Sequence, residues 1–450
     1  MDVDMATHLI LERTAFPVGV APSAPAEEIA AEDSAASRAG LASGLMLALR
    51  FVQARFLSVW GLLAAAALCP AQVFADFALF SALANFISIA TLLRFEAVFF
   101  QSSDQDRLAR AFRLALSAGG AFLTVAALAI AVAGAAGWVV ATYGALFLVS
   151  LAGRAVIRLV SSEATAEGDF AAIGNSNVVQ ALVQPGMMVL LIWPLGATSV
   201  ALFAADAIGH VVSACYLVWR RRAALAGLVR REAWSRLELS ESASRWRTAP
   251  RFLLPSALLS FGFMVAPLLA LPYASNPLLA AHVALAMRLL EVPTQMFSAV
   301  SVPLVLSSLR ARAAESRQSW VRFVTLGLMA AAAALFAAIA FVAIGADAVL
   351  LDGTQWEGVG ETVAIMALFY GGIALVTPLH EIASLSRYPR RQVLTNAVAL
   401  LAAGLVMAWF GTLSLALLGA IGLVSLARML AHVQFAWTRF GVDGFAVARG

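Results

Sequence analysis

Residues 113–158 contain two long apolar runs joined by a short turn, and they read RLALSAGGAFLTVAALAIAVA, then GAAG, then WVVATYGALFLVSLAGRAVIR. A helix of about 20 apolar residues crosses the roughly 30 Å hydrocarbon core of a bilayer, and each run is long enough. The turn at 134–137 is rich in glycine, and the arginines stand only at the outer ends. This stretch predicts two antiparallel membrane-spanning helices.

The same pattern recurs along the whole 450-residue chain, which is 62% hydrophobic and only 12% charged. Soluble domains are closer to half apolar and a quarter charged. We therefore predict an all-α polytopic membrane protein with about 12 transmembrane helices. The predicted spans are 45–69, 74–100, 113–133, 137–159, 175–194, 197–219, 250–272, 278–307, 322–345, 361–384, 392–410 and 413–436.

The arginines indicate how these spans are oriented. All 30 positively charged side chains are arginines, and gaps between spans that contain them alternate with gaps that do not. They occur at both ends and in the even-numbered gaps between spans, where Arg107 follows the second span and Arg154 and Arg158 end the fourth. The odd-numbered gaps contain none. Because arginine-rich loops stay on the cytoplasmic side, both termini are predicted to be cytoplasmic.

Two six-helix bundles are predicted. Residues 1–40 mix proline with acids and lack an apolar period, which is typical of a disordered tail on the cytoplasmic side. The first six spans occupy 41–219 and the last six occupy 250–438. The segment 220–249 is a cytoplasmic linker that either lies on the membrane surface as a helix or is plainly solvated. Residues 439–450 form a second cytoplasmic tail.

Five arginines fall inside the predicted spans, where a guanidinium costs at least about 2.5 kcal/mol unless a partner or a wet cavity receives it. They are Arg50, Arg55, Arg94, Arg288 and Arg428. Three of them, Arg55, Arg94 and Arg288, are candidate substrate contacts, because guanidinium groups match phosphate oxygens with paired donors. Structural alternatives stay open. Arg288 can pair with Glu291 one turn on, Arg55 can contact another helix, and Arg94 can snorkel to the interface.

Arg50 and Arg428 are predicted to snorkel to the cytoplasmic face. Arg94 and Glu96 stand two residues apart in a predicted helix. Residues at that spacing do not face each other on a helix, so each is expected to need a different partner.

Polar residues within other spans have two interpretations. Asp206 and His210 are one turn apart in the sixth span, which suits a proton relay or a cation site, although an internal hydrogen-bonded pair is the favoured interpretation. Asn85, Gln180 and Gln184 can bind sugar hydroxyls or join helices to one another.

Four segments resemble motifs of one transporter family. They read FADFALFSALANFISIATLLRFEAV at 74–98, RTAPRFLLPS at 247–256, RLLEVP at 288–293 and LDGTQWEGVG at 351–360. These are similar to segments of the polysaccharide-biosynthesis flippases, the Wzx-type O-antigen translocases of the MOP superfamily. The match departs from the family pattern at Asp76, where glycine is usual, and at Phe95, where tyrosine is usual.

The resemblance implies a V-shaped transporter of the bacterial inner membrane, whose two bundles open alternately to each side. Its implied cargo is a polyprenyl-diphosphate-linked oligosaccharide, moved to the outer leaflet for surface polysaccharide synthesis. Polysaccharide polymerase and export machinery are implied partners. No cofactor is expected, and the histidines lack a metal-binding spacing such as HExxH.

Other functions fit the sequence less well. A cation-coupled multidrug exporter of the same superfamily should favour embedded acids, whereas arginines outnumber acids in these spans. A membrane glycan polymerase or ligase would need a larger outer loop than 346–360, so no enzyme is predicted. The dispersed arginines do not form the basic face that nucleic acid requires.

Overall fold

The structure is a computed structural model that describes residues 68–101, 105–230, 234–270, 276–311, 314–353, 357–384 and 389–439, with 46, 49, 50, 53, 54 and 57. The predicted tail at 1–40 and nearly all of the predicted tail at 439–450 lie outside these residues. So does most of the first predicted span, 45–69.

The first half of the described chain is a set of long helices separated by tight turns. Its elements are α2 (Ala71–Ser88), the 3-10 helix η1 (Phe95–Gln101), α3 (Gln105–Ala135), α4 (Ala141–Glu167), α5 (Phe170–Leu195) and α6 (Ser199–Leu228). Gly137 and Gly196 adopt positive φ angles of 74° and 70° in the turns after α3 and α5. A glycine accepts this conformation without a Cβ clash, which explains why the helices end there.

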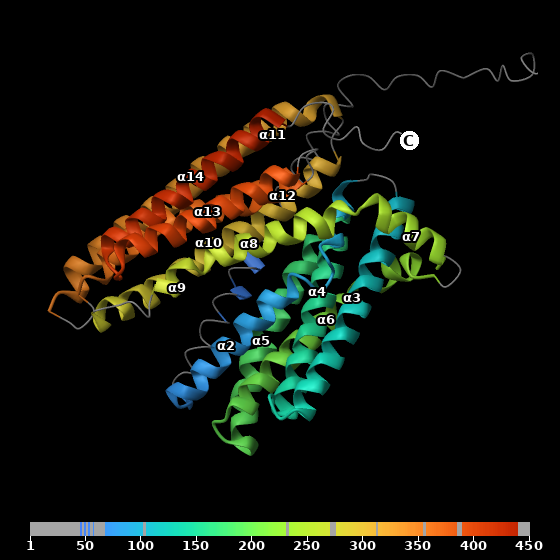
Figure 1. Cartoon of the computed structure of the whole chain (residues 1–450), viewed down its shortest axis with the longest axis horizontal. Coiled ribbons are helices and arrows are strands. Elements are labelled where there is room, and N and C mark those ends of the chain that lie inside the picture. The colour runs from blue at the N-terminus through green and yellow to red at the C-terminus, as the bar shows by residue number, and fades with distance from the viewer. Residues whose placement is uncertain are drawn as a thin grey trace, which may run out of the picture. The chain divides into compact units, whose positions relative to one another are not determined.

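The second half begins with the short helix α7 (Arg236–Arg245) inside the predicted linker. The elements that follow are the π-helix η3 (Ala249–Leu253), α8 (Leu254–Met264), α9 (Ala266–Ala270), α10 (Pro277–Ala311), α11 (Ala314–Ala346), the π-helix η5 (Asp347–Leu351), α12 (Val359–Ser384), α13 (Pro389–Phe410) and α14 (Leu415–Arg439). Within each half, α6 packs against α4 and α5, and α14 packs against α12 and α13 (Figure 1).

Eight helices in the described part of the chain are long and apolar enough to cross a membrane: α3, α4, α5, α6, α11, α12, α13 and α14. Each coincides with a predicted span. No strand occurs in the ranges given above. Trp138, Trp193 and Trp409 are at least four-fifths exposed at helix ends, as expected for aromatic side chains at a bilayer interface. The prediction of an all-α polytopic membrane protein is confirmed.

The second predicted span, 74–100, was wrong as a single helix. The helix α2 ends at Ser88, and Leu93 and Arg94 have positive φ angles of 50° and 62° before η1 begins. The segment is apolar because it is buried, with Phe99 only 1% exposed. Apolar composition reports burial and not helicity, so the bend could not be predicted from it.

Two glycines bring helices into close contact at the centre of each half. A Cβ atom on Gly153 of α4 would lie 3.0 Å from the Cβ of His210 in α6. A Cβ on Gly372 of α12 would lie 3.1 Å from the backbone of Ser425 in α14. Small residues permit this approach, which is how membrane helices gain packing contacts without a hydrophobic driving force.

Candidate functional site: a buried arginine network

One face of α2 is polar although the helix is apolar overall. Ser81, Asn85 and Ser88 are spaced by four and three residues, so they share a face. That face meets α4, where Arg154 and Arg158 are also one turn apart. Arg158 Nη2 donates a hydrogen bond to Ser88 Oγ at 3.3 Å. The two helices are therefore joined by a ladder of arginines and small polar side chains.

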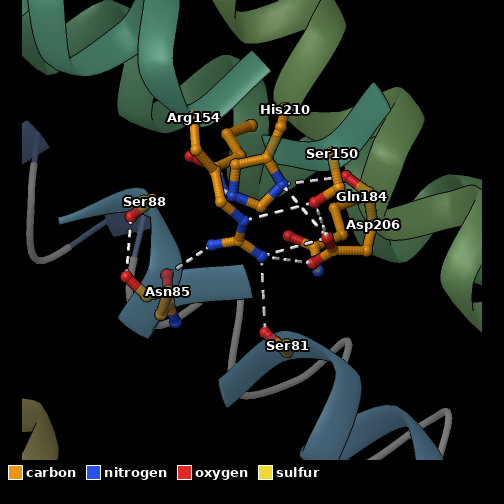
Figure 2. Close-up of polar contacts among 9 residues, drawn as sticks. Ser81, Asn85, Ser88, Ser150, Arg154, Gln184, Asp206 and His210 are labelled. Carbon is orange, nitrogen blue, oxygen red and sulfur yellow. Dashed lines mark hydrogen bonds and ion pairs between the residues drawn. The ribbon is translucent and has the colours of Figure 1, made fainter. Parts of the chain in front are cut away.

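Arg154 is the centre of a hydrogen-bond network (Figure 2). Its Nε donates to Ser150 Oγ at 3.2 Å, and its Nη1 donates to Asn85 Oδ1. Its Nη2 contacts both carboxylate oxygens of Asp206 at 3.0 Å and lies 3.5 Å from Ser81 Oγ. One guanidinium thus connects α2, α4 and α6.

Asp206 is fully buried, with 0% of its surface exposed. Besides the guanidinium of Arg154, it accepts hydrogen bonds from Ser150 Oγ at 2.6 Å and from Gln184 Nε2 at 3.1 Å. A carboxylate can remain charged in an apolar interior only if a cation and hydrogen-bond donors compensate for the lost water. Both kinds of compensation are present here.

His210 extends the network by one helical turn. Its Nδ1 lies 2.8 Å from the backbone carbonyl of Asp206 and 3.5 Å from Asp206 Oδ2. Its Nε2 lies 2.9 Å from Gln180 Nε2. The two predicted polar residues of the sixth span are therefore in contact. Their role in ion or proton coupling remains a prediction.

A second buried arginine lies among α8, α13 and α14. Arg428 is 3% exposed, and it donates to Asn396 Oδ1 at 2.9 Å and to Ser260 Oγ at 2.6 Å. Its guanidinium carbon also lies 4.8 Å from the ring centre of Phe263. Within the described part of the chain, no carboxylate forms an ion pair with it. The prediction that Arg428 snorkels was wrong, because neutral groups receive it inside the helix packing.

The other predicted substrate contacts are only partly described. Arg55 lies outside the described residues. Arg288 belongs to α10, but its side chain is outside the described part. Glu291 is half-buried and accepts a hydrogen bond from Gln295 Nε2 at 2.5 Å. Arg50 contacts Gln53 Oε1 at 3.3 Å. Substrate binding by Arg55, Arg94 and Arg288 remains a prediction.

The expectation that Arg94 and Glu96 have different partners was wrong. Arg94 Nη1 lies 3.4 Å from Glu96 Oε1, and Arg158 Nη1 lies 4.0 Å from the same oxygen. Both Arg94 and Glu96 are buried. The two were expected to point apart because they were assigned to a continuous helix. The positive φ at Arg94 bends the backbone and turns the side chains toward each other.

Arg154 was missed as a site residue because the charge pattern assigned it to the cytoplasmic end of the fourth span. The helix α4 continues to Glu167, so Arg154 lies near its middle and is only 9% exposed. Asp206 was the available signal, since a carboxylate within a span requires a cationic partner. In the described residues, no three histidine, cysteine or acidic side chains gather in a way that could hold a metal ion.

Several solved structures share this helix arrangement. A MATE P26A mutant is 15% identical, with a TM-score of 0.62 over 88% of this chain and 95% of that chain. An outward-facing multidrug resistance MATE family transporter of the MOP superfamily is 13% identical, with a TM-score of 0.62 over 88% and 95%. The fold is that of the MATE transporters.

The eukaryotic MATE transporter AtDTX14 is also similar, at 14% identity and a TM-score of 0.61 over 88% of this chain and 92% of that one. No family model matches the sequence, and no curated protein matches it. The likeness shows the fold, and membership of the MOP superfamily remains a prediction. The fold does not distinguish the flippases from the drug exporters within that superfamily.

Proposed function

We propose that this protein is a membrane transporter that moves a polyprenyl-diphosphate-linked oligosaccharide from the cytoplasmic to the outer leaflet by alternating access. The MATE fold supports transport, and the resemblance of the four sequence segments supports this class of cargo. The observation on which the choice of cargo rests is the charge balance of the buried arginines.

In the first half, the charge of Arg154 is matched, because its guanidinium contacts both carboxylate oxygens of Asp206. In the second half, Arg428 has only amide, hydroxyl and aromatic partners among the described residues. Among the described residues, α14 therefore carries a buried positive charge that no carboxylate compensates. A diphosphate would be attracted by that charge, whereas a cationic drug would be repelled by it.

Energetics favour the same cargo. An anion that leaves a negative-inside cell gains about 2.3 kcal/mol per charge per 100 mV. The sequence contains no GxxxxGK[ST] loop, and a diphosphate cargo does not require a nucleotide motor to move outward.

A second candidate, a cation-coupled drug exporter, is favoured by the fold alone, since one similar structure is named as a multidrug resistance transporter. Such a transporter needs a carboxylate that can bind a cation. Asp206, the buried carboxylate of the network, is already occupied by Arg154. This candidate is therefore the weaker one. A polymerase or ligase activity has no support in the site.

The test is transport by purified protein in proteoliposomes. We expect faster translocation of a fluorescent polyprenyl diphosphate bearing a disaccharide than in protein-free vesicles, measured as protection from dithionite. We expect no uptake of ethidium. Arg288→Ala should abolish lipid translocation while leaving the protein inserted. Ethidium transport without lipid translocation would establish the drug exporter instead.

A further inference from the structure

The buried charges determine which way three amide side chains point. A guanidinium can only donate, so the Asn85 atom that faces Arg154 must be the carbonyl oxygen, Oδ1. A carboxylate can only accept, so the Gln184 atom that faces Asp206 must be Nε2. The usual ambiguity between amide nitrogen and oxygen is removed at both residues.

Gln180 is oriented by the same logic through His210. The Nδ1 of His210 faces a backbone carbonyl, which only accepts, so Nδ1 carries a proton. In the neutral ring, Nε2 is then an acceptor, and Gln180 must present Nε2 to it as a donor. The outer atom of Gln180 is therefore its carbonyl oxygen.

Each amide group has one polar atom that does not bond within the network, here called its outer atom. The outer atoms are the donor Nδ2 of Asn85 and the acceptors Oε1 of Gln180 and Gln184. None of these three atoms has a hydrogen-bond partner in the described part of the chain. Asn85 is exposed, and Gln180 and Gln184 are half-buried. Figure 2 shows Asn85 and Gln184 flanking the same Arg154–Asp206 pair from α2 and α5.

Outer groups of this kind do not belong in contact with lipid tails, because an unsatisfied polar group in hydrocarbon costs several kcal/mol. They require water or a ligand with hydrogen-bonding groups of both kinds. A diphosphate only accepts, so the two carbonyl oxygens would repel it. An ammonium group only donates, so Asn85 Nδ2 would oppose it. A hydroxyl both donates and accepts.

We propose that Asn85, Gln180 and Gln184 form a subsite for the neutral sugar hydroxyls of the cargo, with Arg154 and Asp206 as positioning residues that orient the amides. This inference rests on the proposed function and assigns the glycan, as opposed to the diphosphate, to these three amides. The arginine network does not bind cargo directly, because its charges are already paired.

The test compares two labelled polyprenyl diphosphates in proteoliposomes. One carries an N-acetylglucosamine disaccharide. The other carries a methyl ester in place of the sugar, so both have a diphosphate of the same charge. In the variant Asn85→Asp, the oxygen that accepts from Arg154 is kept, and the outer donor becomes an acceptor. Any repulsion by the added charge acts on both lipids, whereas loss of the donor acts only on the sugar.

We expect Asn85→Asp to raise the KM for the disaccharide lipid relative to the methyl-ester lipid by about three- to tenfold, the effect of one lost hydrogen bond. The matched control is Asn396→Asp. Asn396 also accepts from a buried arginine, but its Nδ2 is already used, donating to Ser256 Oγ at 2.8 Å. That variant should change both lipids equally.

The sugar subsite would be overturned if Asn85→Asp left the ratio of the two KM values unchanged with glucose, galactose and N-acetylglucosamine probes. That result would not contradict lipid transport itself. If wild-type protein moves neither lipid, the proposed function fails instead. Should Asn85→Asp not accumulate, deoxy-sugar probes are used on the unaltered protein. Equal KM values for the hydroxylated and deoxygenated probes would then refute the subsite.

Discussion

Breaking the Arg154–Asp206 pair should be far more costly than removing any neutral member of the network. The variant Arg154→Met removes every donor that the guanidinium supplies and leaves Asp206 with Ser150, Gln184 and the more distant Nδ1 of His210 at 3.5 Å. Removing one partner of a buried ion pair costs about 3–5 kcal/mol, because the other charge stays buried without compensation. Asp206→Asn leaves the guanidinium uncompensated and should cost a similar amount.

The double variant should cost less than the sum of the two single variants, because no isolated charge remains. We expect a coupling free energy of about 2–3 kcal/mol, which is larger than the roughly 0.6 kcal/mol typical of hydrogen bonds between membrane helices. Ser81→Ala is the control. It removes only a long contact of 3.5 Å and should cost less than about 1 kcal/mol.

The assay is equilibrium unfolding in mixed micelles, with the free energy of unfolding measured for the wild type, both single variants and the double variant. Strict additivity, with a coupling below about 0.5 kcal/mol, would refute the reasoning, because independent sites behave in that way. A loss in Ser81→Ala equal to that in Arg154→Met would also contradict it.

Three further predictions concern packing, the second arginine and the membrane potential. Gly153→Ala places a Cβ 3.0 Å from His210 and should lower the free energy of unfolding by about 1–2 kcal/mol in the same unfolding assay. Gly120→Ala should raise that free energy slightly, because a Cβ there has nothing within 4 Å and alanine favours a helix. Arg428→Met should cost at most about 2 kcal/mol, less than Arg154→Met, because it strands no carboxylate, yet it should slow lipid translocation in proteoliposomes. A potassium diffusion potential that is negative on the side from which the lipid leaves should speed lipid translocation severalfold, because roughly two negative charges gain about 4.6 kcal/mol at 100 mV. Slower translocation under this potential would indicate a cationic cargo.

The spans of the long helices could be predicted from the sequence because apolar length is a local property. Residues 113–133 fall inside α3, and 137–159 overlaps α4 from Ala141 onward, while Gly137 in the turn between them adopts the positive φ expected there. The bend after Ser88 could not be predicted, because Leu92 and Phe95 are as apolar in a buried turn as they would be in a spanning helix.

The partners of the buried charges could be predicted only in part. Asp206 and His210 were found because they stand one turn apart in the same helix. The contact between Arg154 and Asp206 depends on how α4 and α6 pack, and nothing in the local sequence specifies that. The charge rule also misplaced Arg154, since it treats an arginine near the predicted end of a span as part of the loop.

The central claim is that guanidinium groups within the helices select an anionic cargo, and the most direct measurement compares two glycolipids that differ only in whether they contain the charged diphosphate. Translocation rates of a diphosphate-linked disaccharide and of the same disaccharide joined directly to the polyprenol should be measured in one proteoliposome preparation. We predict that the diphosphate lipid moves at least about tenfold faster, a difference of 1.4 kcal/mol or more, and that Arg288→Ala abolishes its translocation. Equal rates for the charged and the neutral lipid would contradict the account.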